Sequence, residues 1–280
     1  MSTLNTALSG ALRADDPAAL APLLADPGLA ALTPVAQAAS VGALKCLDAL
    51  LAMGFGVNAT RVDEVTALHL STDLKVTRRL IAAGASLTAV AHGETPLHFA
   101  AANAGPPVIK ALLAAGADPN AVNSRNNTPL GTACALRRVA AVEALLTKPP
   151  ASETTARLLA EFAQRGQQKK DLAVLSALLK VLPADLCSAP DLGTPLHLAA
   201  KAGAVEAVAA LILAGVVVDR ADPQGRTALW LAVSAATTGL NKRPRHHAVV
   251  QALIAAGADP AHPSGGQSPR TLATARGLTI

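Results

Sequence analysis

The sequence has very few aromatic side chains for its length. Its 280 residues include three Phe, one Trp and no Tyr. Compact cores usually rely on aromatic rings, because these side chains bury large areas between packed layers. A core without them has to be built mainly from Ala, Leu, Val and Ile, which suits short helices packed closely together.

Charged residues and cysteines are also scarce. Asp, Glu, Lys and Arg make up 15% of the chain, against about 25% in typical soluble proteins. The net charge of +5 comes from small scattered groups and not from a long basic run, which argues against nucleic-acid binding. Cys46, Cys134 and Cys187 are widely separated, which predicts buried thiols and neither a disulfide framework nor a zinc site.

Long hydrophobic runs are missing as well. No segment is apolar over the length needed to cross a bilayer. The first twenty residues contain Arg13, Asp15 and Asp16 and do not resemble a signal peptide. We therefore expect a cytoplasmic protein with no membrane partner.

What the sequence does contain is a repeated phrase. Thr-Pro-Leu-His-Phe-Ala-Ala at 95–101 returns as Thr-Pro-Leu-His-Leu-Ala-Ala at 194–200, and most spacings between copies are 33 or twice 33. A second phrase, a Leu-rich pair followed by Ala and Gly, recurs with Gly116 and Gly215 separated by 99, three times 33. Two independent markers thus give one period. Looser copies of the first phrase begin at Thr33, Thr66, Thr128, Thr227 and Ser268.

The residues of one copy predict two short helices and a turn. Thr194-Pro195 is a strong helix start, because the hydroxyl caps free amides and Pro loses no hydrogen bond at the first helical position. A turn at Gly203 precedes a second helix, and Gly215 ends it in a conformation that favours glycine. The second helix has an apolar stripe of Val205, Val208, Leu211 and Ile212.

The 33-residue period and the Thr-Pro-Leu-His phrase resemble the ankyrin repeat from about Thr33 to Leu278. The resemblance implies an all-α fold, an α-solenoid of stacked helix pairs with short finger loops, in which neighbouring repeats bury each other's apolar faces. We expect a single domain over 1–280. Its parts are capping helices at 1–32, repeats at 33–65, 66–94, 95–127, 128–153, 154–193, 194–226 and 227–267, and a C-terminal cap at 268–280.

Three stretches depart from the pattern. The repeat at Thr66 is four residues short, which predicts a clipped first helix. The stretch 147–193 is the poorest match; it is interpreted as one divergent repeat, with a flexible break between two shorter stacks as the alternative. The repeat at Thr227 carries an insertion around 237–247, between its two helices.

No residue pattern indicates catalysis, so we expect neither an enzyme nor a cofactor or metal site. His69, His98 and His197 share one slot of the motif, and the resemblance implies that each imidazole bonds the Thr side of its own turn and the neighbouring finger. Trp230 fills the same slot and is expected to pack against a neighbour, or else to anchor a partner. His246-His247 and His262 lie too far apart for one metal ion and are expected on the surface.

The resemblance implies that a partner protein binds the concave side, against finger tips and first helices. Exposed positions there include Ser40-Val41, Ala135-Leu136 and Ser234-Ala235. The candidate partner-binding residues are His92, Glu94, Asn103, Asn123, Ser124, Arg125, Asn126, Lys201, Asp222, Gln224, Arg226 and Trp230.

These features predict a monomeric protein-protein interaction module, an adaptor or an inhibitor. The Ala-rich composition suggests a bacterial source. Two alternatives stay open: an immunity or antitoxin-like protein that neutralises a toxin, and an effector that is exported to bind a host protein. No diagnostic export signal lies near Met1 or Ile280.

Overall fold

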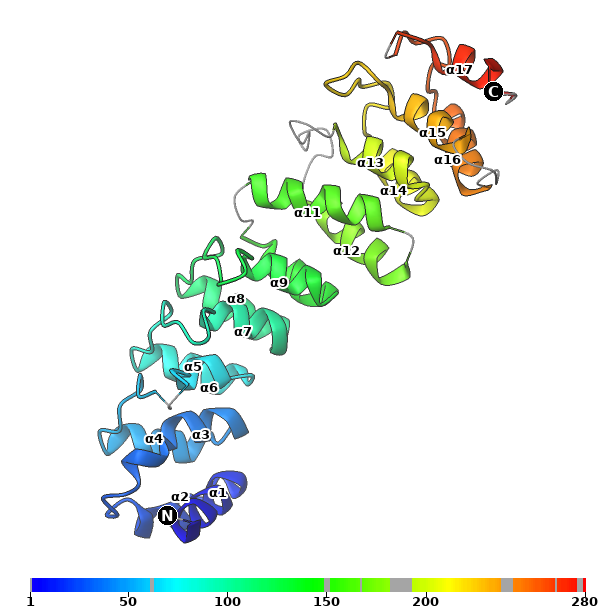
Figure 1. Cartoon of the computed structure of the whole chain (residues 1–280). Helices are drawn as coiled ribbons and strands as arrows, with labels where there is room; N and C mark the ends of the chain where they lie inside the picture. The colour runs from blue at the N-terminus through cyan, green and yellow to red at the C-terminus, as the bar shows by residue number, and fades with distance from the viewer. Residues whose placement is uncertain are drawn as a thin grey trace. The chain divides into compact units, whose positions relative to one another are not determined.

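A computed structural model describes residues 2–60, 63–148, 152–166, 168–181, 193–237, 244–264, 266–275 and 279–280. The chain divides into two compact units, Met1–Pro150 and Ala151–Ile280. Each unit is a stack of short helices (Figure 1), and the described residues contain no β-strand; an isolated bridge joins Ala91 and Glu94. The all-α architecture is confirmed, and the single domain over 1–280 stays a prediction.

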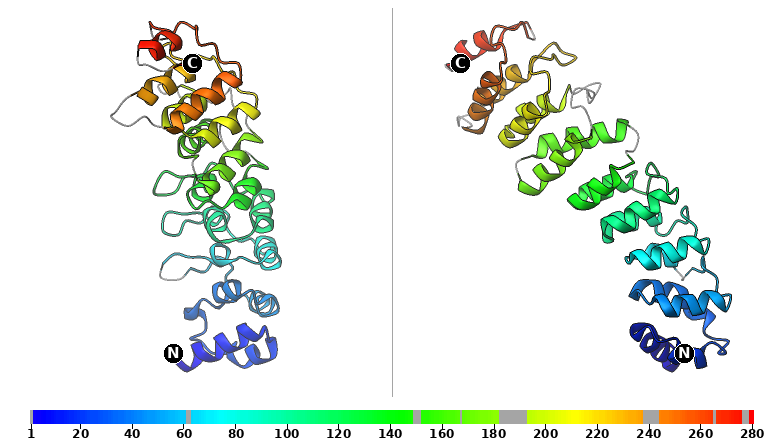
Figure 2. Two further views of the ribbon diagram at one scale, coloured as in Figure 1. Left: turned by 90° about the vertical axis from the view of Figure 1, so that its right-hand side faces the viewer. Right: turned by 180° about the vertical axis from the view of Figure 1, so that it is seen from behind.

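The N-terminal unit consists of helix pairs in which like helices stack on like. The first helices α1, α3, α5, α7 and α9 contact one another in succession, and so do the second helices α2, α4, α6, α8 and α10 (Figures 1 and 2). The elements are α1 (Ser2–Ala14), α2 (Pro17–Leu20), η1 (Ala21–Leu23), η2 (Ala30–Leu32), α3 (Pro34–Val41), α4 (Leu44–Ala52), α5 (Ala67–Leu70), α6 (Leu74–Ala82), α7 (Pro96–Asn103), α8 (Pro106–Ala114), α9 (Pro129–Ala135) and α10 (Val139–Leu145).

The C-terminal unit repeats this arrangement. The first helices α11, α13, α15 and α17 are neighbours in turn, as are the second helices α12, α14 and α16. The divergent stretch 147–193 therefore contains a helix pair, α11 and α12. The division between the units falls just before α11. The elements are α11 (Ser152–Arg165), α12 (Lys169–Leu179), α13 (Pro195–Ala202), α14 (Val205–Leu213), α15 (Ala228–Thr237), α16 (Pro244–Ala255) and α17 (Pro269–Ala275).

The core is built from the small aliphatic side chains that the composition demands. In α14, Ala207, Val208 and Leu211 are buried, whereas Val205 and Ile212 from the predicted stripe are half-buried. Each fully buried Leu contributes about 1.5–3 kcal/mol relative to an exposed one. The stack is therefore held by many modest contacts between successive helix pairs.

Two of the three cysteines lie in this core. Cys46 and Cys134 are buried thiols, as predicted, whereas Cys187 lies outside the described residues. Burial, aided by the negative charge of Asp15, raises the pKa of the Cys46 thiol to about 11. Cys46 is thus kept as a neutral, unreactive thiol.

The shortened repeat loses residues in two places. Gly84 follows Thr66 by 18 positions, whereas Gly116 follows Thr95 by 21, and α5 accordingly has only four residues. This agrees with the predicted clipped first helix. The fourth residue is missing elsewhere, because Thr95 follows Gly84 by 11 positions and Thr128 follows Gly116 by 12. That deletion falls in the finger, which the sequence analysis did not identify.

The insertion separates α15 from α16, and its residues 238–243 lie outside the described part of the chain. The prediction that His246 lies on the surface is wrong. Its side chain is buried, and Nε2 lies 3.1 Å from the carbonyl oxygen of Lys201, at the end of α13. Gly203 leaves the room for the ring, since a Cβ there would lie 2.8 Å from the His246 Cε1 atom. The first turn of α16 therefore packs on the end of α13.

Candidate partner-binding surface

Each complete motif forms a closed hydrogen-bonding unit at the start of its first helix. The Thr95 amide donates to Nδ1 of His98 at 3.3 Å, and the Thr95 hydroxyl lies 2.9 Å from the same nitrogen. Because Nδ1 accepts from a backbone amide, the ring proton is assigned to Nε2. Nε2 then donates to the carbonyl oxygen of Asn127 at 2.9 Å, in the following finger.

The same unit recurs at the other two histidines. His69 reaches the carbonyl oxygen of Glu94 at 3.2 Å, and His197 reaches that of Arg226 at 2.9 Å. Burial lowers the pKa of His69, His98 and His197 and outweighs the hydrogen bonds that raise it, which agrees with neutral rings. The predicted structural role of the three histidines is confirmed: each joins its own turn to the next finger.

The finger at Ala91–Glu94 is a two-residue hairpin. The amide and carbonyl of Ala91 and Glu94 pair in both directions at 2.9 Å. The two residues between them, His92 and Gly93, have φ angles of 52° and 77°, the left-handed pair of a type I′ turn. This tight turn accounts for the residue missing from the finger, and it leaves the His92 side chain exposed.

The next finger is one residue longer and is organised from within by Asn123. Its Oδ1 accepts from the amides of Arg125 and Asn127, each at 3.0 Å. Its Nδ2 donates to Oε1 of Glu94 at 3.1 Å, so the side chain also joins two fingers. Asn126 takes the left-handed position with a φ of 58°. The buried Asn123 shapes the turn, and Ser124, Arg125 and Asn126 are displayed to solvent.

The C-terminal unit has a matching finger with a carboxylate in that position. Oδ1 of Asp222 accepts from the amides of Gln224 and Arg226 at 3.0 and 2.8 Å, and Oδ2 accepts from the Arg226 Nε at 2.8 Å. Burial raises the pKa of Asp222, but the hydrogen bonds and charge of Arg226 outweigh it and leave the pKa below its ordinary value. Asp222 and Arg226 thus hold the turn, while Gln224 is exposed.

Trp230 replaces histidine in the motif slot and makes different contacts. The Arg226 guanidinium lies over its ring, 5.7 Å from the centroid. The Thr227 hydroxyl accepts from the Trp230 amide at 3.3 Å. This bond corresponds to the threonine half of the capping box, whereas the histidine half has no counterpart in the indole ring. The indole Nε1 is buried and has no hydrogen-bond partner among the described residues. The ring is half-buried against its finger, so packing is its main contribution.

The candidate residues divide into two groups by exposure. Asn123 and Asp222 are buried, and Glu94, Arg226 and Trp230 are half-buried and bonded within or between fingers. The exposed group consists of His92, Asn103, Ser124, Arg125, Asn126, Lys201 and Gln224. The first-helix positions Ser40, Val41, Ala135 and Leu136 are also exposed, whereas Ser234 and Ala235 are half-buried.

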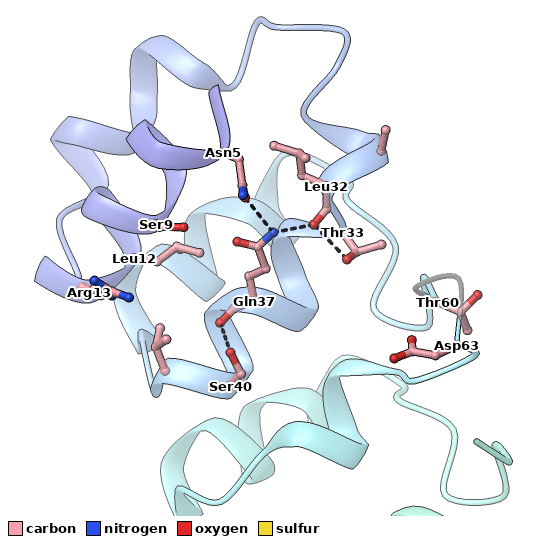
Figure 3. Close-up of a pocket in the computed structure, with 12 residues that line it drawn as sticks. Asn5, Ser9, Leu12, Arg13, Leu32, Thr33, Gln37, Ser40, Thr60 and Asp63 are labelled. Carbon is pink, nitrogen blue, oxygen red and sulfur yellow. Dashed lines mark hydrogen bonds between the residues drawn. The ribbon is translucent and has the colours of Figure 1, made fainter. Parts of the chain in front are cut away.

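In the N-terminal unit, we call the first helices together with the fingers the inner surface. It includes a pocket of about 760 Å³ lined by α1, η2, α3 and the loop after α4 (Figure 3). Arg13 from α1 and Asp63 from the loop give it one cation and one anion. The remaining lining residues are Asn5, Ser9, Leu12, Ala31, Leu32, Thr33, Gln37, Ser40, Val41 and Thr60.

Gln37 fixes one wall of this pocket. Its Nε2 donates to the carbonyl oxygen of Leu32 at 2.8 Å and reaches Oδ1 of Asn5 at 3.4 Å (Figure 3). Thr33 has a φ of 46°, and its hydroxyl donates to the Leu32 carbonyl instead of capping α3. The pocket is therefore lined by amide and hydroxyl groups in defined positions, with apolar side chains between them.

The sequence analysis identified Ser40 and Val41 as exposed positions, but it treated the segment that forms α1 only as part of the N-terminal cap. The signal for its contribution was present, because Asn5, Ser9 and Arg13 follow one another at intervals of four and so share a helix face. Thr60 and Asp63 lie in a loop whose conformation no local pattern specifies.

The described residues contain no group of three or more His, Cys, Asp or Glu side chains that could hold a metal ion. None of the helices in the described part of the chain combines the length and apolar character needed to span a bilayer. What the surface offers is shape, hydrogen-bonding groups and scattered charge.

The comparisons with known proteins agree with this fold. A channel relative, the transient receptor potential cation channel subfamily A member 1 homolog of Caenorhabditis elegans, is 30% identical over 205 residues, which cover 71% of this chain but only 14% of the channel protein. The crystal structure of the human ASB11 ankyrin repeat domain is 26% identical with a TM-score of 0.54, covering 81% of this chain and 99% of that domain. The family model for ankyrin repeats in three copies matches residues 72–157 and 161–274, more than half of the sequence. The chain therefore belongs to the ankyrin repeat family.

Proposed function

We propose that the chain binds a partner protein through the inner surface of its N-terminal unit and acts as an adaptor or an inhibitor. The observation that carries this proposal is the pocket of about 760 Å³ between the first helices and the loop after α4. Ankyrin repeats are protein-interaction modules, so a hollowed inner surface is the natural place to look for a contact.

The chemistry of the pocket indicates the kind of contact. Its polar side chains come from α1, α3 and the loop. The apolar side chains of Leu12, Leu32 and Val41 lie between them. Val41 is 49% exposed and Leu136, at the end of α9, is 54% exposed. A partner with a few apolar side chains inside a polar rim matches this mixture. Few aromatic anchors are available, so affinity depends on fit and on hydrogen bonds.

The finger tips extend the same surface. Ser124 and Arg125 are exposed on a turn that the buried Asn123 holds in one conformation. A turn fixed in advance loses little conformational entropy when a partner binds. We include His92, Ser124, Arg125 and Asn126 of the fingers and Asn103 of α7 in the proposed contact, and we assign Asn123 and Glu94 to its support.

We further propose that the protein works as a monomer in the cytoplasm and that its partner is a protein and not a nucleic acid. Two buried thiols suit a reducing compartment, and a chain without a basic run suits a protein partner. No feature of the described residues favours an immunity or an effector role over the general one.

Crosslinked affinity purification from the native cells tests the proposal. The full chain is compared with Arg13→Glu/Arg125→Glu, which reverses two exposed charges on the inner surface. The control is Lys45→Glu/Lys170→Glu, which makes the same charge change at exposed positions of second helices. Circular dichroism establishes that both variants remain folded.

We expect a protein that the wild type and the control variant both retain and that the inner-surface variant loses. Equal retention by all three chains would contradict the proposed location. The absence of any specific protein with the wild type would contradict the interaction function itself.

A further inference from the structure

A second hollow lies on the opposite set of helices of the N-terminal unit. It has a volume of about 640 Å³ and is lined by Leu74, Arg78, Ile81 and Ala82 of α6 and by Pro106, Pro107, Lys110, Ala111, Ala114 and Ala115 at α8. We call it the outer groove. We propose that the outer groove binds an acidic helical segment of a partner protein, independently of the inner surface.

The shape of the groove follows from its two helices. Leu74, Arg78 and Ile81 are spaced as neighbours on one face of α6, and Pro107, Lys110 and Ala114 are spaced likewise on α8. The helices lie side by side, so the groove runs between two roughly aligned rows of side chains. Alanines make up much of the α8 row, which leaves space for a third helix to approach closely. Docking an amphipathic helix into such a groove is a common mode of peptide recognition.

The charges of the groove determine what that helix must carry. Arg78 on α6 and Lys110 on α8 both line it and are exposed. Within the described residues, neither side chain forms an ion pair or a hydrogen bond. Arg79, by contrast, pairs with Asp48 on α4 and is not available. The groove therefore presents two uncompensated cations beside an apolar floor, which complements acidic side chains next to apolar ones.

The charged neighbours along α6 do not cancel this charge. Lys75, one position after Leu74, is a further exposed cation on α6. The nearest carboxylate along α6 is that of Asp73, and it already accepts from the amides of Lys75 and Val76 at 2.8 and 3.0 Å. Asp73 thus serves as the N-cap of its own helix.

The observations favour a protein segment over an anionic membrane. A bilayer surface is broad, and interfacial binding elements use a wide basic face with Trp, Phe or Leu to insert. The outer groove instead is a hollow between two nine-residue helices, and no aromatic residue lines it. Its two cations match discrete carboxylates on a short segment.

Selection from a displayed library of random 16-residue peptides tests the inference on the full chain. We expect enriched peptides that carry Glu or Asp beside apolar residues at three- and four-residue spacing. Arg78→Glu/Lys110→Glu should weaken their binding by about tenfold or more, because attraction becomes repulsion. The control Lys45→Glu/Lys170→Glu should bind them as the wild type does.

A groove-filling variant gives a second measurement that leaves the charges unchanged. Ala114 is exposed and lines the groove, so Ala114→Phe should block the peptides without disturbing the core. Enriched peptides that lack acidic residues, or that bind both groove variants normally, would overturn the proposal. So would the absence of enriched peptides together with charge-dependent binding of phosphatidylserine vesicles, which would assign the cations to a membrane.

Discussion

His98 donates a hydrogen bond from Nε2 to the carbonyl oxygen of Asn127, 2.9 Å away and 29 positions further along the chain. His197 makes the same bond to Arg226, also at 2.9 Å and 29 positions away. Each bond starts in the first turn of one repeat and ends in the finger before the next. The histidine therefore holds the finger, on which exposed candidate residues such as Ser124 and Arg125 are displayed.

Removing one of these rings should destabilise the stack measurably. We predict that His98→Ala lowers the free energy of unfolding by about 2–4 kcal/mol, because it removes the histidine half of the capping box and leaves the half-buried Asn127 carbonyl without its donor. Urea unfolding of the full chain measures the loss. Lys45→Ala, at an exposed position, should change the free energy by less than about 0.5 kcal/mol and provides the control.

The same histidines should make stability depend on pH. Burial lowers the pKa of His69, His98 and His197 below the ordinary value of 6.5, so the unfolded chain takes up protons before the folded chain does. Stability is then fully present above about pH 6.5 and is lost as the pH falls from there through the folded-state pKa values. Thermal unfolding between pH 7.5 and 5 measures this loss.

His98→Gln isolates the contribution of one imidazole ring to the dependence of stability on pH. Glutamine in this position can still accept from the N-cap amide, but it does not titrate. The variant should lose less stability than the wild type between pH 7.5 and 5. An unchanged slope would show that protonation of His98 does not oppose folding.

A methyl group added at Gly93 tests the contact between its finger and the next one, which carries Ser124. Gly93 has a φ of 77°, and a Cβ there would lie 2.7 Å from the Ser124 Cβ. Gly84 has a φ of 83°, but a Cβ there would meet nothing within 4 Å. Both Gly→Ala variants carry backbone strain of about 1–2 kcal/mol. Gly93→Ala should cost more than Gly84→Ala in urea unfolding, and equal costs would refute close packing of the fingers.

The finger of the C-terminal unit separates the effect of shape from the effect of charge. Asp222→Asn keeps an oxygen that accepts from the amides of Gln224 and Arg226, as Asn123 does in its own finger. It should cost about 1–2 kcal/mol, because the amide nitrogen that replaces Oδ2 cannot accept from the Arg226 Nε and that bond is lost. Asp222→Ala leaves the amides without an acceptor and should cost about 2–3 kcal/mol or more. Thermal unfolding of the two variants side by side reveals whether the turn or the charge dominates.

The motif histidines and the helix starts at Thr-Pro could be predicted because local chemistry dictates them. A hydroxyl before proline favours a capped helix start, as at Thr128, and a slot that holds histidine three times indicates a shared role. The missing finger residue was also recorded in the spacing between Gly84 and Thr95. The sequence analysis instead assigned the whole deletion to the first helix of that repeat.

Other features depend on contacts between repeats, which no single segment of the sequence specifies. His246 is buried because Gly203, 43 positions earlier, leaves room for its ring at the end of α13. Asn123 was identified as a finger residue, but its side chain faces inward to bond Glu94. The pocket requires α1, α3 and the loop after α4 together. Such pairings become visible only once the helix pairs are stacked.

The most direct test of the central claim is the affinity of the purified partner for a chain whose pocket has been filled. Ser40 is exposed on α3 and lines the pocket, so Ser40→Trp occludes it while the fold persists. We predict that Kd, measured by calorimetry, rises at least about tenfold, equivalent to about 1.4 kcal/mol. It should stay at the wild-type value in Ala114→Phe, which fills the outer groove. An unchanged Kd in Ser40→Trp would contradict binding through the inner surface of the N-terminal unit.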